Sequence, residues 1–208
     1  MGGYEKEFSY FVRMIPSEGT ILDIGANIGI MTTMLAKKCN AAAIYAFEPM
    51  PENVRALEKV IRFHRLKNVQ IVATALGDRN GMVQMIMPVV NHSKMQGLSH
   101  VVMSAEQQQG EIFSVPIQRM DDMPALQALE KITAIKLDVE NFEYYVLKGG
   151  WGILNKHKPI VYCELWDDER RELCIDFMKK MGYRTKVYRK GELVDFDGHS
   201  SISFFFLP

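Results

Sequence analysis

The sequence predicts an α/β fold in which helices cover both faces of a mostly parallel sheet. Short apolar runs, typical of strands buried on both faces, alternate with longer helical segments. A glycine turn from Gly25 to Gly29 joins the first strand to the helix that follows it. Acidic residues come directly after several of the strands. Ligands of open α/β sheets bind beyond the carboxyl ends of the strands, so this edge is the predicted site.

The first elements lie on either side of the glycine turn. Residues 1–18 are predicted to be an N-terminal helical extension, because apolar residues recur in them at helical spacing, and we expect it against the sheet edge. A buried strand is predicted at Ile21–Ile24 and a helix at Asn27–Lys38. Gly25 allows a sharp turn where a Cβ could obstruct a ligand. Gly29 would lie in the first helical turn and could bring the helix close to the sheet.

The pattern of strand and helix continues after this helix. Strands are predicted at Ala41–Glu48 and Val69–Leu76, with the helix Glu52–Leu66 between them. Asn80-Gly81 is a hairpin turn signal, and Met82–Val89 alternates enough to form the return strand.

The segment Asn91–Gly110 is polar and shows no regular period. A loop of about 20 residues inside a compact domain is usually either functional or disordered. We expect a mobile loop on the substrate side, with Ser93, Ser99 and His100 as possible contacts; plain disorder is the alternative.

The second half of the chain continues the α/β pattern within what we expect to be a single domain, residues 1–208. Two carboxylates, Asp138 and Glu140, follow one of its buried strands and suggest a site. The predicted elements are a strand at Glu111–Met120, a short helix at Asp121–Lys131, a strand at Ile132–Val139, a helix at Phe142–Lys156, a strand at Pro159–Trp166, a helix at Asp167–Met181, and an antiparallel strand pair at Tyr183–Tyr188 and Ser201–Leu207.

Composition excludes several classes of protein. The 25 basic and 25 acidic residues give a net charge of 0, so no basic field for nucleic acid is expected. The three cysteines lack a C-x-x-C spacing, which favours reduced thiols in a cytoplasmic protein. The histidines are scattered singly, so no metal site is predicted. No apolar run is long enough to span a membrane.

The residues of the glycine turn favour one class of nucleoside cofactor. A dinucleotide fingerprint requires G-x-G-x-x-G, but Asn27 stands where its middle glycine would be. Asp23 places a carboxylate at the turn, and the resulting D-x-G-x-N-x-G pattern resembles the first motif of the S-adenosylmethionine (SAM) methyltransferases, in which this aspartate works near the cationic amino group of the cofactor. Glu48, which follows Gly25 by 23 residues, is spaced to accept both hydrogens of a ribose diol. Its alternative role is to interact with the dipole of the next helix. Met50 is predicted to lie against the adenine.

Five ordered stretches resemble the FkbM-type family of SAM-dependent methyltransferases. They are L-D-I-G-A-N-I-G at 22–29, A-F-E-P-M-P-E-N at 46–53, A-T-A-L-G-D-R-N-G at 73–81, V-P-I-Q-R-M-D-D-M at 115–123 and I-K-L-D-V-E-N-F-E-Y-Y-V-L-K-G at 135–149. The resemblance implies a Rossmann-like class I methyltransferase with a sheet of about seven strands. It also implies transfer of the methyl group of SAM, usually to a hydroxyl on a sugar or a natural-product scaffold.

The cofactor residues follow from the resemblance and from the strand ends taken together. They are Asp23, Gly25, Ala26, Asn27, Gly29, Glu48, Met50, Ala75 and Asp138. The family usually has glycine after D-V-E, where this chain has Asn141. Asparagine is the non-glycine residue that best adopts positive φ, so we expect the turn to survive.

Glu140 is the candidate general base, because an alcohol hydroxyl is a poor nucleophile until its proton leaves. Asp138 would help to hold the cationic end of SAM. The alternative for Glu140 is to cap the helix that begins near Phe142. Two other functions stay open. A nicotinamide-dependent oxidoreductase would need the missing middle glycine, and a non-catalytic SAM-binding protein would not need the acidic residues retained here.

Overall fold

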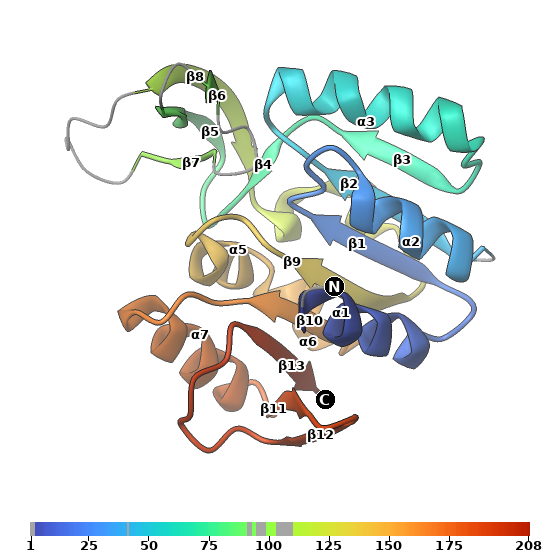
Figure 1. Ribbon diagram of the computed structural model, residues 1–208, viewed down its shortest axis with the longest axis vertical. Helices are drawn as coiled ribbons and strands as arrows, with labels where there is room; N and C mark the ends of the chain where they lie inside the picture. Colours follow the sequence, from blue (N-terminus) through green and yellow to red (C-terminus); the bar gives the residue numbers. More distant parts are fainter. Residues whose placement is uncertain (1–2, 41, 91–92, 95–98, 103–109) are drawn as a thin grey trace.

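The computed structural model describes residues 3–40, 42–90, 93–94, 99–102 and 110–208. Within these residues an eight-stranded sheet forms the centre of the molecule, with a second sheet beside it (Figure 1). In order across the central sheet, the strands are β12 (Glu192–Asp195), β11 (Arg184–Arg189), β13 (Ser203–Leu207), β10 (Ile160–Glu164), β9 (Ile132–Leu137), β1 (Thr20–Ile24), β2 (Ala43–Phe47) and β3 (Val69–Val72).

The predicted α/β class is confirmed, because five neighbouring strands, β10, β9, β1, β2 and β3, run parallel. Alternate residues of each strand face opposite sides of the sheet. Ile21, Ala134 and Phe205 pack beneath helices on one face, whereas Leu22 and Ile135 pack beneath helices on the other. The first face carries α1 (Gly3–Met14), α2 (Ile30–Lys38) and α3 (Pro51–His64), and the second carries α5 (Glu143–Gly149), α6 (Trp151–His157) and α7 (Glu169–Lys180).

The ends of the sheet differ from the prediction in two ways. β13 pairs antiparallel with both β10 and β11, which confirms the antiparallel pair, but β12 adds an eighth strand within the described part of the chain. Lys190 and Gly191 both have positive φ, 50° and 102°, and form the tight turn between β11 and β12. The N-terminal helix does not lie at the sheet edge. Its Phe8 and Phe11 pack on Tyr162 of β10, so α1 covers a face.

The second sheet shows that the predicted strand Val69–Leu76 is wrong in extent. The chain leaves the central sheet after Val72 and enters the second sheet at Ala75, where the Thr74 hydroxyl donates to the Pro116 carbonyl at 3.0 Å. The sheet comprises β4 (Ala75–Leu76), β8 (Gly110–Gln118), β5 (Gly81–Val90) and β6 (Ser93–Lys94), and β7 (His100–Val101) pairs with β5.

The hairpin predicted at Asn80-Gly81 is also wrong. β5 pairs antiparallel with β8, and β4 pairs parallel with β8, so β5 does not return along the strand before it. Asn80 instead bonds across the sheet, since its Oδ1 accepts from the Arg119 backbone N–H at 2.8 Å. Of the predicted loop Asn91–Gly110, β6, β7, Ser99 and Val102 are described, together with Gly110, the first residue of β8. The rest lies outside the described residues.

Helix boundaries differ from the predicted ones where glycines intervene. α2 begins at Ile30, three residues later than predicted, because Gly29 adopts a left-handed conformation as its N-cap. The predicted helix Phe142–Lys156 is divided into α5 and α6 at Gly150. The short helical segment after β8 consists of a 3-10 turn, Met120–Asp122, and α4 (Pro124–Gln127). Among the described helices, none has the length and apolar character needed to cross a membrane.

Candidate functional site

A cavity opens at the carboxyl ends of β1, β2 and β9. Seven of the predicted site residues line it. These are Gly25, Asn27, Glu48, Met50, Ala75, Asp138 and Glu140. Apolar side chains that the sequence analysis did not single out complete much of the lining, including Phe47, Leu76, Met85, Val101 and Phe142. Ser99, one of the loop residues named as a possible contact, also lines the cavity.

The glycine turn has the close backbone contact that excludes a side chain. Gly25 has φ of 78°, and a Cβ there would lie 1.8 Å from the Asp138 carbonyl oxygen. The turn after β1 therefore contacts Asp138, the residue directly after β9. Gly29 serves a different purpose from the predicted one. With φ of 92°, it makes room for α3, since a Cβ would lie 2.5 Å from Leu57 Cδ1, and it does not line the cavity.

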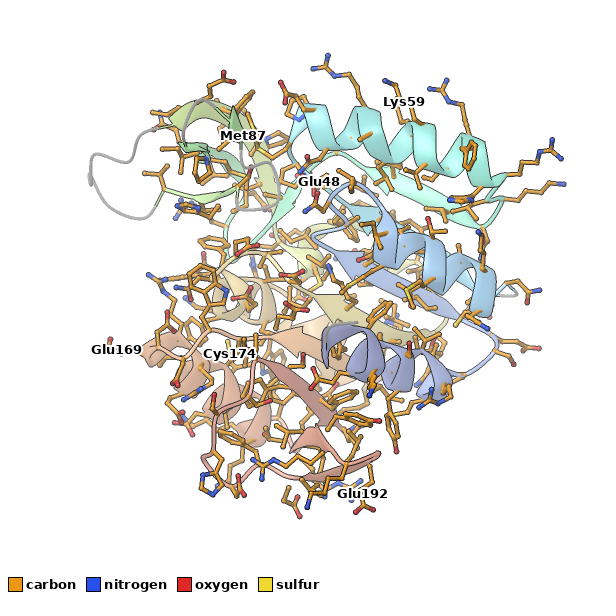
Figure 2. All side chains as sticks on the ribbon, in the orientation of Figure 1. Glu48, Lys59, Met87, Glu169, Cys174 and Glu192 are labelled. Atoms are coloured by element: carbon orange, nitrogen blue, oxygen red, sulfur yellow. The ribbon has the colours of Figure 1, made fainter. Side chains whose placement is uncertain are left out.

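Glu48 is fixed at the cavity by three N–H donors. Its Oε2 accepts from the Asn27 backbone N–H at 2.8 Å, and its Oε1 accepts from the Met50 backbone N–H at 2.9 Å and from Asn53 Nδ2 at 3.2 Å. Burial raises the pKa of Glu48, although these bonds oppose the shift. Figure 2 shows Glu48 between the β2–α3 corner and the second sheet, whereas Lys59 of α3 points to solvent. Glu48 thus borders the cavity and also bonds Met50, the N-cap of α3.

Asp23 is fully buried and does not line the cavity. Its Oδ2 accepts from the Thr32 hydroxyl at 2.6 Å, and its Oδ1 lies 3.6 Å from Lys136 Nζ. Asp23 therefore lies behind the cavity lining, where it contacts Thr32 of α2 and Lys136 of β9. Ala26 lines a neighbouring cavity of about 800 Å³ on the α2 side, which Lys136 and Asp138 also border.

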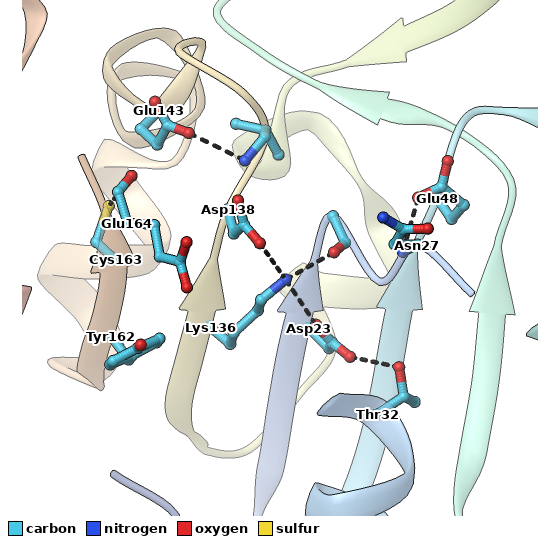
Figure 3. A network of polar contacts seen from close by, with 12 residues as sticks. Asp23, Asn27, Thr32, Glu48, Lys136, Asp138, Glu143, Tyr162, Cys163 and Glu164 are labelled. Carbon is cyan, nitrogen blue, oxygen red and sulfur yellow. Dashed lines mark hydrogen bonds and ion pairs between the residues drawn. The ribbon is translucent and has the colours of Figure 1, made fainter. Parts of the chain in front are cut away.

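Lys136 is a site residue that the sequence analysis missed. Its side chain is 2% exposed, and its Nζ donates to the Gly25 carbonyl at 2.6 Å and lies 3.4 Å from Asp138 Oδ2 (Figure 3). The available signal was a lysine inside the buried strand Ile132–Leu137, because a lysine is almost never fully buried without a partner. The pKa of Lys136 is raised, since Asp138 and Asp23 outweigh its burial.

Three glutamates near Asp138 have pKa values raised to about 7. For Glu140 and Glu164, burial is the largest cause, followed by repulsion from Asp138. Burial also raises the pKa of Glu143 to about 7. Glu143 Oε1 accepts from the Val139 backbone N–H at 3.0 Å, so Glu143, and not Glu140, ties down the turn before α5. The helix-cap alternative for Glu140 is therefore wrong in the described structure.

The turn after β9 keeps its shape with Asn141 in place of glycine. Asn141 has φ of 69°, which confirms the expectation of a positive φ. Its Nδ2 also donates to Asp168 Oδ2 at 2.6 Å, and Asp168 caps α7. Glu140 itself has φ of 55°, a strained conformation for a non-glycine residue that costs on the order of 1–2 kcal/mol. In this conformation Glu140 lines the cavity, and strained residues of this kind cluster at functional sites.

The raised pKa of Glu143 predicts how stability depends on pH. Between its ordinary pKa of 4.5 and about 7, the folded protein holds a proton that the unfolded chain releases, so stability falls as pH rises through this window. Glu143→Gln keeps the oxygen that bonds Val139 and removes the charge. We expect it to raise the free energy of unfolding by roughly 2–3 kcal/mol at pH 8 and by little at pH 4.5.

Urea denaturation at the two pH values measures this difference. Glu58→Gln on the exposed side of α3 is the matched control, with an expected effect within about 0.5 kcal/mol. An equal effect of Glu143→Gln at both pH values would contradict the assignment.

Comparison with known proteins places this site in a family. The profile of the Methyltransferase FkbM domain matches residues 23–185. Methyltransferase 1 of Beauveria bassiana is 27% identical over 154 residues, which cover 67% of this chain and 61% of the relative. Methyltransferase sdnD of Sordaria araneosa is 27% identical over 168 residues, which cover 67% of this chain and 63% of the relative. The chain thus spans about three fifths of the length of these two curated relatives.

Solved structures share the fold. The FkbM methyltransferase of Methylobacillus flagellatus has a TM-score of 0.62 at 16% identity, over 91% of this chain and 44% of that chain. A Streptococcus mutans protein solved in complex with S-adenosylhomocysteine (SAH) has a TM-score of 0.56 at 11% identity. The match covers 99% of this chain and 96% of that chain. The fold is that of the class I methyltransferases, and the match over residues 23–185 shows that the chain belongs to the methyltransferases with an FkbM domain.

Proposed function

We propose that the protein transfers the methyl group of SAM to a hydroxyl of a sugar or another small-molecule acceptor. The observation that carries this proposal is the convergence of Glu48, Asp138 and Glu140 on one cavity beside the glycine turn. The three carboxylates come from the ends of two strands, β2 and β9, and from the turn after β9. A negative, partly apolar cavity of this kind suits a nucleoside that carries positive charge.

The residues present fit SAM part by part. The apolar lining from Phe47, Met50 and Leu76 suits an adenine ring, and Glu48 beside it suits a ribose diol. Asp138, with a side chain 29% exposed, is the carboxylate available to the cationic methionine end. Because Gly25 has no Cβ, the turn after β1 lies directly against the Asp138 carbonyl, and both residues line the cavity. When bound, SAM supplies a methyl group on a sulfonium, which is already a good leaving group.

The chain then has to orient the acceptor and remove its proton. Alignment of the acceptor oxygen with the methyl carbon is a matter of positioning. Glu140 is placed in the cavity lining and has a pKa raised to about 7, near the pH at which a general base works best. In this proposal a Glu140 carboxylate oxygen accepts the hydroxyl proton as the acceptor oxygen attacks.

Calorimetry tests the cofactor. The folded protein should release or absorb heat with SAM and with its demethylated product SAH, because Glu48 and Asp138 can bind parts that both share. NAD should bind at least tenfold more weakly, since Asn27 replaces the middle glycine that a pyrophosphate requires. Tight NAD binding without SAM or SAH binding would support the oxidoreductase alternative instead.

Glu140→Gln tests the base. We expect kcat for methyl transfer to fall by roughly 10²–10⁴-fold while the affinity for SAH changes little. In the wild type, activity should rise with pH through about 7 as Glu140 loses its proton, and this rise should disappear in the variant. Activity is followed as SAH formation with a panel of sugar and small-molecule alcohols, with Glu58→Gln as control. Wild-type turnover in Glu140→Gln would eliminate the base role.

A further inference from the structure

Lys136 stands behind the cavity at the point where β1 and β9 lie side by side. Asp23 and Lys136 are directly paired in the register of these two strands. From this position the Lys136 ammonium contacts the Gly25 carbonyl at 2.6 Å, Asp138 at 3.4 Å and Asp23 at 3.6 Å. One side chain therefore joins the glycine turn to the carboxylate that follows β9 (Figure 3).

We propose that Lys136 is a positioning residue of the methyl-transfer site, because it fixes the glycine turn and the Asp138 carboxylate relative to each other. The inference rests on the proposed function. Lys136 borders the neighbouring cavity and not the main cavity around Glu48 and Glu140, and its contacts with the lining of the main cavity are those with Gly25 and Asp138. The 2.6 Å bond to the Gly25 carbonyl fixes the backbone of the glycine turn, which lines the cavity. The ion pair fixes which way the Asp138 carboxylate points.

The chemistry of the cluster requires a buried cation at this place. Asp23 is fully buried, and its Oδ1 accepts no hydrogen bond in the described structure, so the ammonium 3.6 Å away balances its charge. Figure 3 shows the Glu164 carboxylate of β10 turned towards the same lysine. A purely structural ion pair would require only Asp23 and Lys136. The additional bond to Gly25 and the pairing with Asp138 extend the network to the cavity.

Lys136 also influences the candidate base through space. Its charge lowers the pKa values of Glu48, Glu140 and Glu164, against the burial that raises them. The titratable groups that act on Glu140 are Lys136 of β9, Asp138 directly after β9, His100 of β7 and Glu164 of β10. Removal of the ammonium therefore shifts the pKa of Glu140 upward. A lysine that only stabilised the fold would not move the pH dependence of catalysis.

The test compares Lys136→Met, Lys136→Arg and a matched control, Lys131→Met. Lys131 Nζ donates to the His157 carbonyl at 2.7 Å, at the opposite end of β9. We expect Lys136→Met to weaken SAH binding roughly 10–100-fold, as for the loss of a charge-assisted contact, and to move the rise of kcat/KM to higher pH. Lys136→Arg should restore the wild-type pH profile and part of the affinity. Lys131→Met should match the wild type in both measurements.

The outcomes separate this inference from the proposed function. Absence of SAM and SAH binding to the wild type would overturn the proposed function, and the inference with it. Binding by the wild type, together with wild-type affinity and pH profile in a folded Lys136→Met protein, would overturn the inference alone. If Lys136→Met does not fold, Asp23→Asn/Lys136→Met removes both buried charges, and the same comparison is made in that variant.

Discussion

The ion pair between Lys136 and two aspartates is the interaction on which the site depends. Parallel strands bring their carboxyl ends to one edge. Here β10 ends in Glu164, Glu48 and Asp138 directly follow β2 and β9, and Asp23 lies one residue before the end of β1. Burial, and after it repulsion from Asp138, raises the pKa values of Glu140 and Glu164 to about 7. The buried ammonium offsets part of that repulsion and anchors the glycine turn.

The cavity has two walls of different origin. The polar wall consists of the strand ends and the glycine turn of the central sheet, whose geometry is fixed by close backbone contacts such as that of Gly25 with Asp138. The second sheet contributes the apolar residues Leu76, Met85 and Val101, and Phe47 of β2 and Phe142 before α5 add further apolar lining. Helix α5 of the central sheet lies directly against the chain just after β4, because a Cβ on Gly149 would lie 1.8 Å from the Gly77 carbonyl oxygen.

Much of the central sheet could be predicted from local pattern. Strands such as Ala43–Phe47 are continuous apolar runs, and the residues after the strands identify the functional edge. The second sheet could not be predicted in the same way, because the pairing of β5 with β8 is set by contacts distant in sequence. The apparent single strand 69–76 concealed the change of sheet, since both of its halves are apolar.

The site residues that follow strand ends could be predicted from the sequence. Those whose side-chain direction depends on contacts with distant residues could not. Glu48, Asp138 and Glu140 follow strand ends, so their convergence follows from topology. Asp23 points away from the cavity because Thr32 and Lys136 bind it, and its sequence position carries no information about that choice. The conformation of Asn141 was predictable from its residue type, but its bond to Asp168 was not.

A crystal structure of the protein with SAH tests the central claim most directly. The account predicts the ribose hydroxyls within hydrogen-bond distance of Glu48, the methionine ammonium beside Asp138, and Glu140 facing the thioether sulfur. It also predicts that Lys136 stays bonded to the Gly25 carbonyl. SAH bound elsewhere, or bound here with the Asp138 carboxylate turned away from its ammonium, would contradict the account.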